Sequence, residues 1–324
     1  MTGDSEEADA EVLSPDEAFK RLGNEIRVAI LQELGAADEP VRFSDLRKEL
    51  DVTDSGKFNY HLDQLTGHFI EQTAEGYQLR RPGERIIQAV LSGAVTESPT
   101  LEPTSIDWRC HRCGAEPIEV DYREEQVGVY CTSCEGIYGG ERDQEKVNIP
   151  AERERLYYLH LPPAGIVGRS PKEAFVAASR WTNAETVTAA NGICPRCSAR
   201  LVESATVCRN HTTDSGLCDA CNNRYAVMYR VRCTNCVYEL EAIYANKLMT
   251  NLELRSFLID HGLNPHHPQR EAFLEVLYPY EEDIHSVDPL AVTFTFTGDE
   301  ESISLSIDDS LEVVNVERTS GAEQ

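Results

Sequence analysis

The residues with the most chemistry in this sequence are its eleven cysteines, ten of which fall into five CxxC pairs. A CxxC turn directs two thiolates toward one point, and two such turns supply the four ligands of a tetrahedral metal ion. The N-terminal stretch MTGDSEEADAEV is acidic and lacks the apolar run of a signal peptide. We therefore expect a cytoplasmic protein, in which paired thiols bind metal more often than they form disulfides.

The first two pairs are separated by seventeen residues that predict a strand (PIEVDY), a turn (REEQ) and a second strand (VGVY). Such a hairpin returns the second pair to the first, which is typical of a zinc ribbon with one structural zinc ion. A redox dithiol is the alternative, and two pairs at this spacing disfavour it. The predicted ligands are Cys110, Cys113, Cys131 and Cys134.

One cysteine, Cys208, is left over, but it lies three residues before His211 in the stretch VCRNH. Counting the two as a pair gives eight ligands between residues 194 and 236, enough for two closed four-coordinate zinc sites. Without His211, seven ligands fill one site and leave three thiolates; a free Cys208 beside a surface histidine is that alternative. The predicted ligands are Cys194, Cys197, Cys208, His211, Cys218, Cys221, Cys233 and Cys236.

The pairing within this second region follows from its turns. The segments ARLVESATV (199–207) and RYAVMYRV (224–231) contain no Gly or Pro, so each is predicted to be one strand, with the turn in RNHTTDSG between them. At about 3.3 Å per residue, Cys221 and Cys233 then lie roughly 40 Å apart and cannot share an ion. Nested sites are therefore favoured, with Cys208, His211, Cys218 and Cys221 at the turn and the outer pairs at the open end. Tandem pairing needs hidden turns in both strands and stays open.

Three closed zinc sites leave no coordination position for substrate or water, so the zinc is predicted to be structural. The sequence also lacks the motifs GxxxxGK[ST], GxGxxG, GxSxG and HExxH. We therefore expect no enzyme.

The segment 14–94 alternates predicted helices with one hairpin. The helices are SPDEAFKRLG, NEIRVAILQELG (stopping at Gly35), SDLRKELD (capped by Ser44), KFNYHLDQLTGH and RPGERIIQAVLSG; VRF is a short strand, and FIEQT-AEG-YQLRR is the hairpin. This order is that of a winged helix-turn-helix, and the segment resembles the ArsR-like winged-helix repressors. LGNEIRVAILQEL resembles the dimerising scaffold of that family, RFSDLRKELDVTDSGKFNYHLDQL its helix-turn-helix and FIEQTAEGYQLR its wing.

The resemblance implies that the fourth helix enters the major groove of double-stranded DNA. With Phe58, Leu62 and Leu65 facing the core, the outward side chains are predicted to contact DNA, and His61 is expected to pack inside. A winged helix used for protein contact is the alternative. The predicted DNA-binding residues are Ser55, Lys57, Asn59, Tyr60 and Gln64 of the helix and Arg80 and Arg81 of the wing. The third helix, SDLRKELD, lacks the cysteines with which metal sensors of the family bind their ion.

The charge of the chain bears on its partners. The net charge is −26, from 56 acidic and 30 basic residues, of which six are lysines. An acidic, lysine-poor composition favours adaptation to molar salt, where the screening length is only about 3 Å. Acidity is therefore no argument against DNA binding, although residues 14–93, with ten basic and fourteen acidic side chains, form no basic patch.

The sequence thus predicts an α+β chain in seven segments and, since no run of eighteen apolar residues exists, no membrane span. The segments are an acidic disordered tail (1–13), the winged helix-turn-helix (14–94), a linker rich in Pro, Ser and Thr (95–107), the four-cysteine ribbon (108–140), a connector with a helix from Ser170 to about Ala190 (141–190), the two-site zinc hairpin (191–245) and a C-terminal helix with strands LAVTFTFT, SISLSI and LEVVNVER (246–324).

This layout resembles the multi-domain ArsR-like regulators of halophilic archaea. The resemblance implies a DNA-binding transcriptional regulator that forms a homodimer, with the zinc-stapled region serving regulation or assembly. The alternative is an interaction protein of the transcription machinery. The archaeal initiation factor related to the eukaryotic open-complex factor also joins a winged helix to a zinc ribbon, but two further zinc sites and a strand-rich tail depart from its layout.

Overall fold

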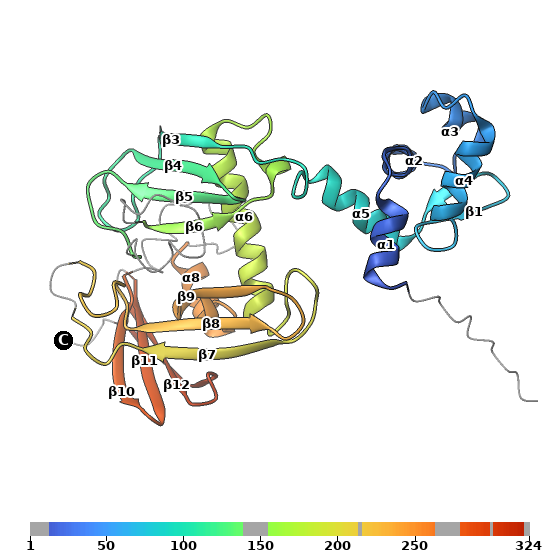
Figure 1. Ribbon diagram of the computed structural model, residues 1–324. Coiled ribbons are helices and arrows are strands. Elements are labelled where there is room, and N and C mark those ends of the chain that lie inside the picture. Colours follow the sequence, from blue (N-terminus) through green and yellow to red (C-terminus); the bar gives the residue numbers. More distant parts are fainter. Residues whose placement is uncertain (1–12, 139–154, 213–215, 263–278, 299–300, 321–324) are drawn as a thin grey trace, which may run out of the picture. The chain divides into compact units, whose positions relative to one another are not determined.

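The computed structural model describes residues 13–138, 155–212, 216–262, 279–298 and 301–320, and the chain divides into two compact units, residues 1–97 and 98–324 (Figure 1). The predicted acidic tail lies outside the described residues except for Leu13. The fold is mixed α+β, as predicted, and every strand pair is antiparallel. Within the described ranges, no helix is long and apolar enough to cross a membrane.

The first unit has the predicted order of elements. Val41 bridges to Tyr77, which adds the short strand expected at VRF to the hairpin. The elements are α1 (Pro15–Leu22), α2 (Glu25–Ala36), α3 (Phe43–Glu49), α4 (Ser55–Leu65), β1 (Ile70–Gln72), β2 (Tyr77–Leu79) and α5 (Arg81–Leu91).

Local sequence explains where these elements begin. Ser14 and Glu17 form a capping box at α1, and the carboxylate of Asp54 accepts hydrogen bonds from the first turn of α4. The hairpin turns at Gly76, whose φ is +156°; a side chain there would meet the Val41 carbonyl at 2.5 Å. The core of the unit is apolar and includes Ile30, Leu31, Leu46, Phe58, Leu62 and Leu65.

Several boundaries differ from the prediction; α4, for example, runs from Ser55 to Leu65 and not over KFNYHLDQLTGH. Helix α3 begins at Phe43, without a side-chain cap, because the Phe43 ring packs edge-on against Phe58 with centroids 5.3 Å apart. Helix α2 continues one residue past Gly35. The hairpin ends at Leu79, so Arg80 and Arg81 do not lie on its strands. Arg80 is the N-cap of α5, and Arg81 is the first residue of that helix, as in the predicted helix RPGERIIQAVLSG; Pro82 favours a helical first turn.

The second unit begins with a four-stranded sheet in the order β3 (Leu101–Ile106), β4 (Ile118–Arg123), β5 (Gln126–Cys131) and β6 (Tyr157–His160). The predicted ribbon hairpin is β4–β5. Strand β3 lies inside the predicted linker and β6 inside the predicted connector. Strand β3 was not predicted because it contains Pro103, which has no N–H to donate to the hydrogen bonds between strands. The proline is tolerated because β3 is the edge strand and its register shifts between Leu101 and Thr104.

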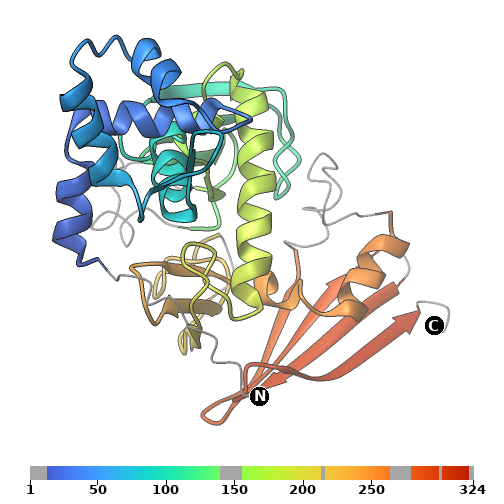
Figure 2. The same cartoon turned by 90° about the vertical axis from the view of Figure 1, so that its right-hand side faces the viewer.

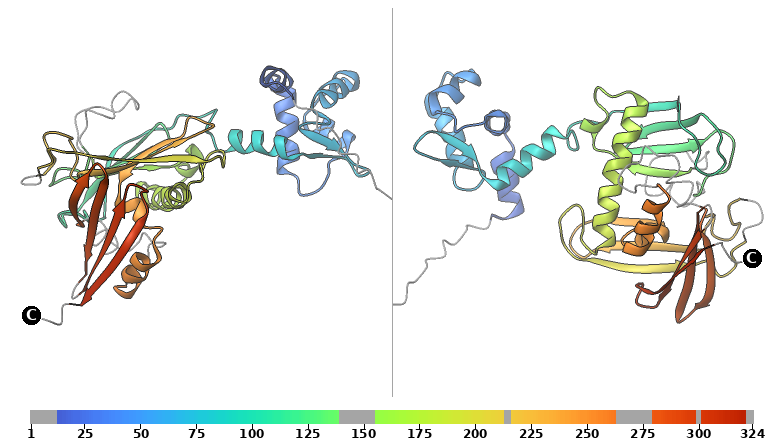
Figure 3. Two further views of the ribbon diagram at one scale, coloured as in Figure 1. Left: turned by 90° about the horizontal axis from the view of Figure 1, so that it is seen from below. Right: turned by 180° about the vertical axis from the view of Figure 1, so that it is seen from behind.

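Helix α6 (Pro171–Ala190) begins at Ser170 as predicted and packs on this sheet, with Phe175 edge-on to Trp108. A short 3-10 turn, η1 (Pro163–Gly165), precedes it. The helix spans from the first sheet to the second (Figures 1 and 3). The second sheet consists of β7 (Leu201–Val207), β8 (Val227–Cys233) and β9 (Glu239–Ile243), followed by α7 (Ala245–Leu248). The predicted long hairpin is β7–β8, and β9 is an additional strand.

The chain ends in α8 (Leu252–Asp260) and a sheet in the order β10 (Glu281–Val287), β11 (Leu290–Thr297), β12 (Glu301–Asp308) and β13 (Val313–Ser320). Helix α8 lies against one face of this sheet (Figure 2), where Phe257 and Leu258 share a core with Phe294 and Leu305. The three predicted strands are present. Strand β10, EEDIHSV, was not predicted because it begins with three acidic residues and shows little apolar alternation.

Candidate metal centres and nucleic-acid interface

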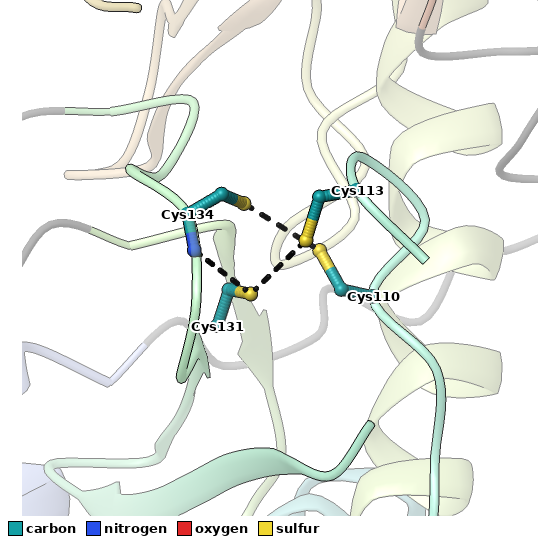
Figure 4. A group of neighbouring side chains, drawn as sticks. All are labelled: Cys110, Cys113, Cys131 and Cys134. Carbon is teal, nitrogen blue, oxygen red and sulfur yellow. Dashed lines mark hydrogen bonds between the residues drawn. The ribbon is translucent and has the colours of Figure 1, made fainter. Parts of the chain in front are cut away.

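The first cysteine group joins two loops of the first sheet. Cys110 and Cys113 lie between β3 and β4, whereas Cys131 ends β5 and Cys134 follows it (Figure 4). Their sulfur atoms interleave: Cys110 Sγ lies 3.8 Å from Cys134 Sγ, and Cys113 Sγ lies 3.6 Å from Cys131 Sγ. The backbone N–H groups of Ser133 and Cys134 donate to Cys131 Sγ, both at 3.3 Å, which holds this thiolate toward the centre.

The remaining ligands form two groups at opposite ends of the β7–β8 hairpin, in which Leu201 pairs with Cys233 and Val207 with Val227. At the open end, Cys194 Sγ lies 3.6 Å from Cys236 Sγ and Cys197 Sγ lies 3.5 Å from Cys233 Sγ. At the turn end, the group consists of Cys208, His211, Cys218 and Cys221. The nested arrangement is therefore confirmed, and the tandem alternative is wrong.

The separations within the groups suit a tetrahedral ion. In each group the four ligand atoms lie within 4.8 Å of one another. Bonds of about 2.3 Å to sulfur and about 2.0 Å to nitrogen place two sulfurs about 3.8 Å apart, and sulfur and nitrogen about 3.5 Å apart. A disulfide would need about 2.05 Å; all eleven cysteines are free. The described residues thus contain three four-residue groups placed to hold metal ions.

The pKa values of the cysteine thiols also favour a bound cation. Burial raises the pKa of Cys110 to about 11. Burial, together with the neighbouring thiols of Cys208 and Cys218, raises the pKa of Cys221 to about 12. Several thiolates this close repel one another, so each group ionises fully only with a cation at its centre.

The ring of His211 is oriented for ligation. Its Nδ1 atom lies 3.5 Å from Cys221 Sγ, and its Nε2 atom lies 3.0 Å from the carbonyl oxygen of Arg224. Since a carbonyl only accepts, Nε2 carries the proton and the lone pair of Nδ1 faces the thiolates. His111, in the first CxxC turn, is no ligand: it is buried and stacks on Tyr157, and burial lowers its pKa to about 3.

The second predicted site, the outward face of α4, has the expected pattern of exposure. Phe58, Leu62 and Leu65 are buried, as is His61, which is 5% exposed. Its burial, with a smaller contribution from Arg27 and Lys57, lowers the pKa of His61. The predicted DNA-binding side chains Ser55, Lys57, Asn59 and Tyr60 are exposed, and Gln64 is half-buried.

Two features of this face were not expected. The side-chain amide of Asn59 donates to the Asp63 carboxylate at 3.0 Å, so one candidate base reader is held by an acidic neighbour. Arg81 pairs with Glu84 at 2.5 Å within α5, whereas Arg80 is exposed at the start of that helix. The two arginines thus lie beside the hairpin and not on its strands.

Sequence reasoning missed a set of charged residues that join elements of the second unit. Arg196, inside the CPRC turn, pairs with Glu185 of α6 at 2.6 Å and contacts His160 Nε2 at 2.9 Å. Lys247 is buried and pairs with Glu203 at 2.8 Å. The only signal for Lys247 in the sequence was its rarity, as one of six lysines.

Comparison with known proteins gives families without an assigned function. Residues 107–313, more than half of the chain, match the domain of unknown function DUF7351, and the chain belongs to this family. Residues 15–90 match the domain of unknown function DUF7347. No curated protein and no solved structure matches the chain. The first match falls within the second unit and contains all three metal-ligand groups; the other falls within the first unit.

Proposed function

We propose that the chain is a DNA-binding transcriptional regulator whose first unit is an ArsR-like winged helix-turn-helix and whose second unit is built around three structural zinc ions. The observation that carries the DNA-binding part is the two-sided character of α4. One side carries buried Phe58, Leu62 and Leu65, and the other presents exposed Lys57, Asn59 and Tyr60. A helix fixed in this way, followed by a hairpin, suits insertion into a major groove.

Zinc is proposed because sets of four cysteines, or of three cysteines and one histidine, with tetrahedral separations are its usual structural sites. Each ion replaces apolar core that short hairpins cannot supply and contributes directly to folding. All four positions of each site are filled by protein, so we assign the ions no catalytic role. The homodimer remains part of the proposal; Phe19 of α1 and Leu91 of α5 are exposed apolar side chains, 73% and 62% accessible, that a second copy could cover.

The proposal is tested by selecting binding sites from random duplex DNA with the full chain in molar KCl, followed by footprinting. We expect enrichment of a defined sequence, since base hydrogen bonds survive salt that screens phosphate contacts. Lys57→Ala or Asn59→Ala should weaken binding to that sequence, each by about 1–3 kcal/mol if the contact is bidentate. Arg85→Ala, exposed on α5, is the matched control.

A second candidate is an interaction protein of the transcription machinery. It is favoured by Asp63, which shares a face with Asn59 and holds its amide. A carboxylate beside the base-reading positions repels DNA phosphates but suits a basic protein surface. Co-purification with RNA polymerase, together with no enriched DNA sequence, would support this function over the first.

A further inference from the structure

The metal-ligand group at the turn end of the β7–β8 hairpin, here called the third metal centre, consists of Cys208, His211, Cys218 and Cys221. Hydrogen bonds through the segment 224–227 connect it to the C-terminal sheet. The Arg224 carbonyl faces His211 Nε2 at 3.0 Å. The Ala226 carbonyl accepts a bond from the backbone N–H of Cys208 at 2.9 Å. The segment therefore contacts two of the four ligands from outside the group.

The same segment is held on its other side by Glu282 of β10. The backbone N–H of Ala226 donates to Glu282 Oε2 at 2.7 Å, and that of Val227 donates to both carboxylate oxygens at 3.3 Å. The Tyr280 hydroxyl donates to Oε1 at 3.3 Å, and the Tyr280 ring stacks on Tyr225 with centroids 4.2 Å apart. Glu282 is thus fixed by three donors while it fixes the backbone next to the ligands.

The segment is buried in the core of the second unit, where Tyr225, Ala226 and Val227 are at most 5% exposed. A cavity of about 540 Å³ borders it, and its wall includes His211, Arg224, Tyr225, Tyr280, Glu282 and Ile284. The backbone N–H groups of Ala226 and Val227 are buried, so they need an acceptor, and Glu282 supplies it. These hydrogen bonds fix the backbone at the position where it meets His211 and Cys208.

We propose that Glu282 is a positioning residue for the third metal centre: it holds the segment 224–227 so that the Arg224 carbonyl keeps the Nδ1 atom of His211 directed at the ion. The inference rests on metal binding at this group, which is part of the proposed function. Groups that hydrogen-bond to a ligating histidine fix its tautomer and orientation, and losing such a group lowers metal affinity by about 10- to 100-fold.

The test compares Glu282→Gln with Glu281→Gln in the zinc-loaded full chain. Glutamine keeps the shape but replaces one accepting oxygen by a donor, which cannot pair with a backbone N–H. Glu281 is exposed on the same strand and serves as the matched control. Because burial raises the pKa of Glu282 to about 7, the measurement is made at pH 8. A chromophoric chelator then competes for zinc, giving the number of ions per chain and the affinity of the weakest.

We expect Glu282→Gln to loosen one zinc ion by about 10-fold, the lower end of the range for a direct partner of a ligand, because Glu282 acts through the backbone. Two ions should remain tightly bound, and Glu281→Gln should behave as wild type. Equal loosening of all three ions would indicate general unfolding and overturn the inference, as would unchanged release by a variant that holds three ions. A wild-type count of two would instead refute the third zinc ion, and with it the basis of the inference.

A second measurement does not depend on the Glu282 variant folding. His211→Ala removes the contact between the histidine ring and the Arg224 carbonyl. The segment 224–227 should then be less ordered, its bonds to Glu282 should open more often, and hydrogen exchange of the Ala226 and Val227 amides should be faster. Unchanged protection of these two amides in that variant would overturn the inference.

Discussion

The Nδ1 atom of His211 lies 3.5 Å from the Sγ atom of Cys221, the separation expected for two ligands of one tetrahedral ion. This distance bears on the role of Cys208, the cysteine outside the five CxxC pairs. Cys208 can belong to a four-residue metal group only if His211 is the fourth ligand. We predict that His211→Ala lowers the zinc content from three ions per chain to two, measured by elemental analysis. His285→Ala, an exposed histidine on β10, should retain three. Three ions in the His211 variant would mean that another residue completes the site.

The two sides of α4 should respond differently to truncation. Leu62 is fully buried, so Leu62→Ala should lower the free energy of unfolding of the first unit by about 2–5 kcal/mol. Tyr60 is 56% exposed, and Tyr60→Ala should change that free energy by less than about 0.5 kcal/mol while weakening DNA binding. Denaturant titration and DNA-binding titration of both variants separate the two effects. A destabilised Tyr60 variant would show that this side chain is structural.

Burial of His61 predicts a pH dependence in the first unit, which contains no metal-ligand group among its described residues. Neither ring nitrogen has a hydrogen-bond partner within the described part of the chain, and the folded-state pKa is lowered below the ordinary 6.5. The unfolded state therefore takes up a proton more readily, so this contribution is fully present above pH 6.5 and is lost as the pH falls toward the folded-state pKa.

The check is the thermal midpoint of the first unit at pH 7 and pH 5. His61→Leu fills the same space without a titrating group and should show a smaller decrease on acidification than wild type. Equal decreases in the two proteins would contradict a destabilising role for protonation at this site.

Lys247 is predicted to be essential for the packing of the second unit. Its ammonium group pairs with Glu203 at 2.8 Å and donates to the Ala190 carbonyl at 3.1 Å, at the end of α6. Lys247→Met leaves the partly buried Glu203 carboxylate without this cation and should cost about 3–5 kcal/mol. The double variant with Glu203→Gln removes both charges and should recover part of the loss in chemical denaturation; equal stability of the single and double variants would argue against the ion pair.

The metal groups could be predicted from sequence because a CxxC turn is local and its spacing specifies the ligands. The nested pairing also followed, since ARLVESATV and RYAVMYRV offer no place to turn. Strands β3, β6 and β10 could not be predicted in this way. Strand β3 contains Pro103, β10 begins with three acidic residues, and β6 lies in a segment without clear apolar alternation. Their pairing depends on neighbours distant in sequence.

Contacts between distant side chains were likewise invisible to sequence patterns. Glu282 meets the amides of Ala226 and Val227 only because the C-terminal sheet folds back onto β8. Arg80 and Arg81 illustrate the opposite error. The sequence placed both at the end of the predicted hairpin, but β2 ends at Leu79, Arg80 is the N-cap of α5 and Arg81 is its first residue, followed by Pro82.

The most direct test of the central claim, that α4 of this chain reads DNA, is genome-wide crosslinking of the native chain beside a variant that combines Lys57→Ala, Asn59→Ala and Tyr60→Ala. We predict discrete genomic sites that share one sequence in wild type and that disappear in the triple variant, while its zinc content stays at three ions per chain. No discrete sites in wild type, or the same sites in the variant, would contradict the claim.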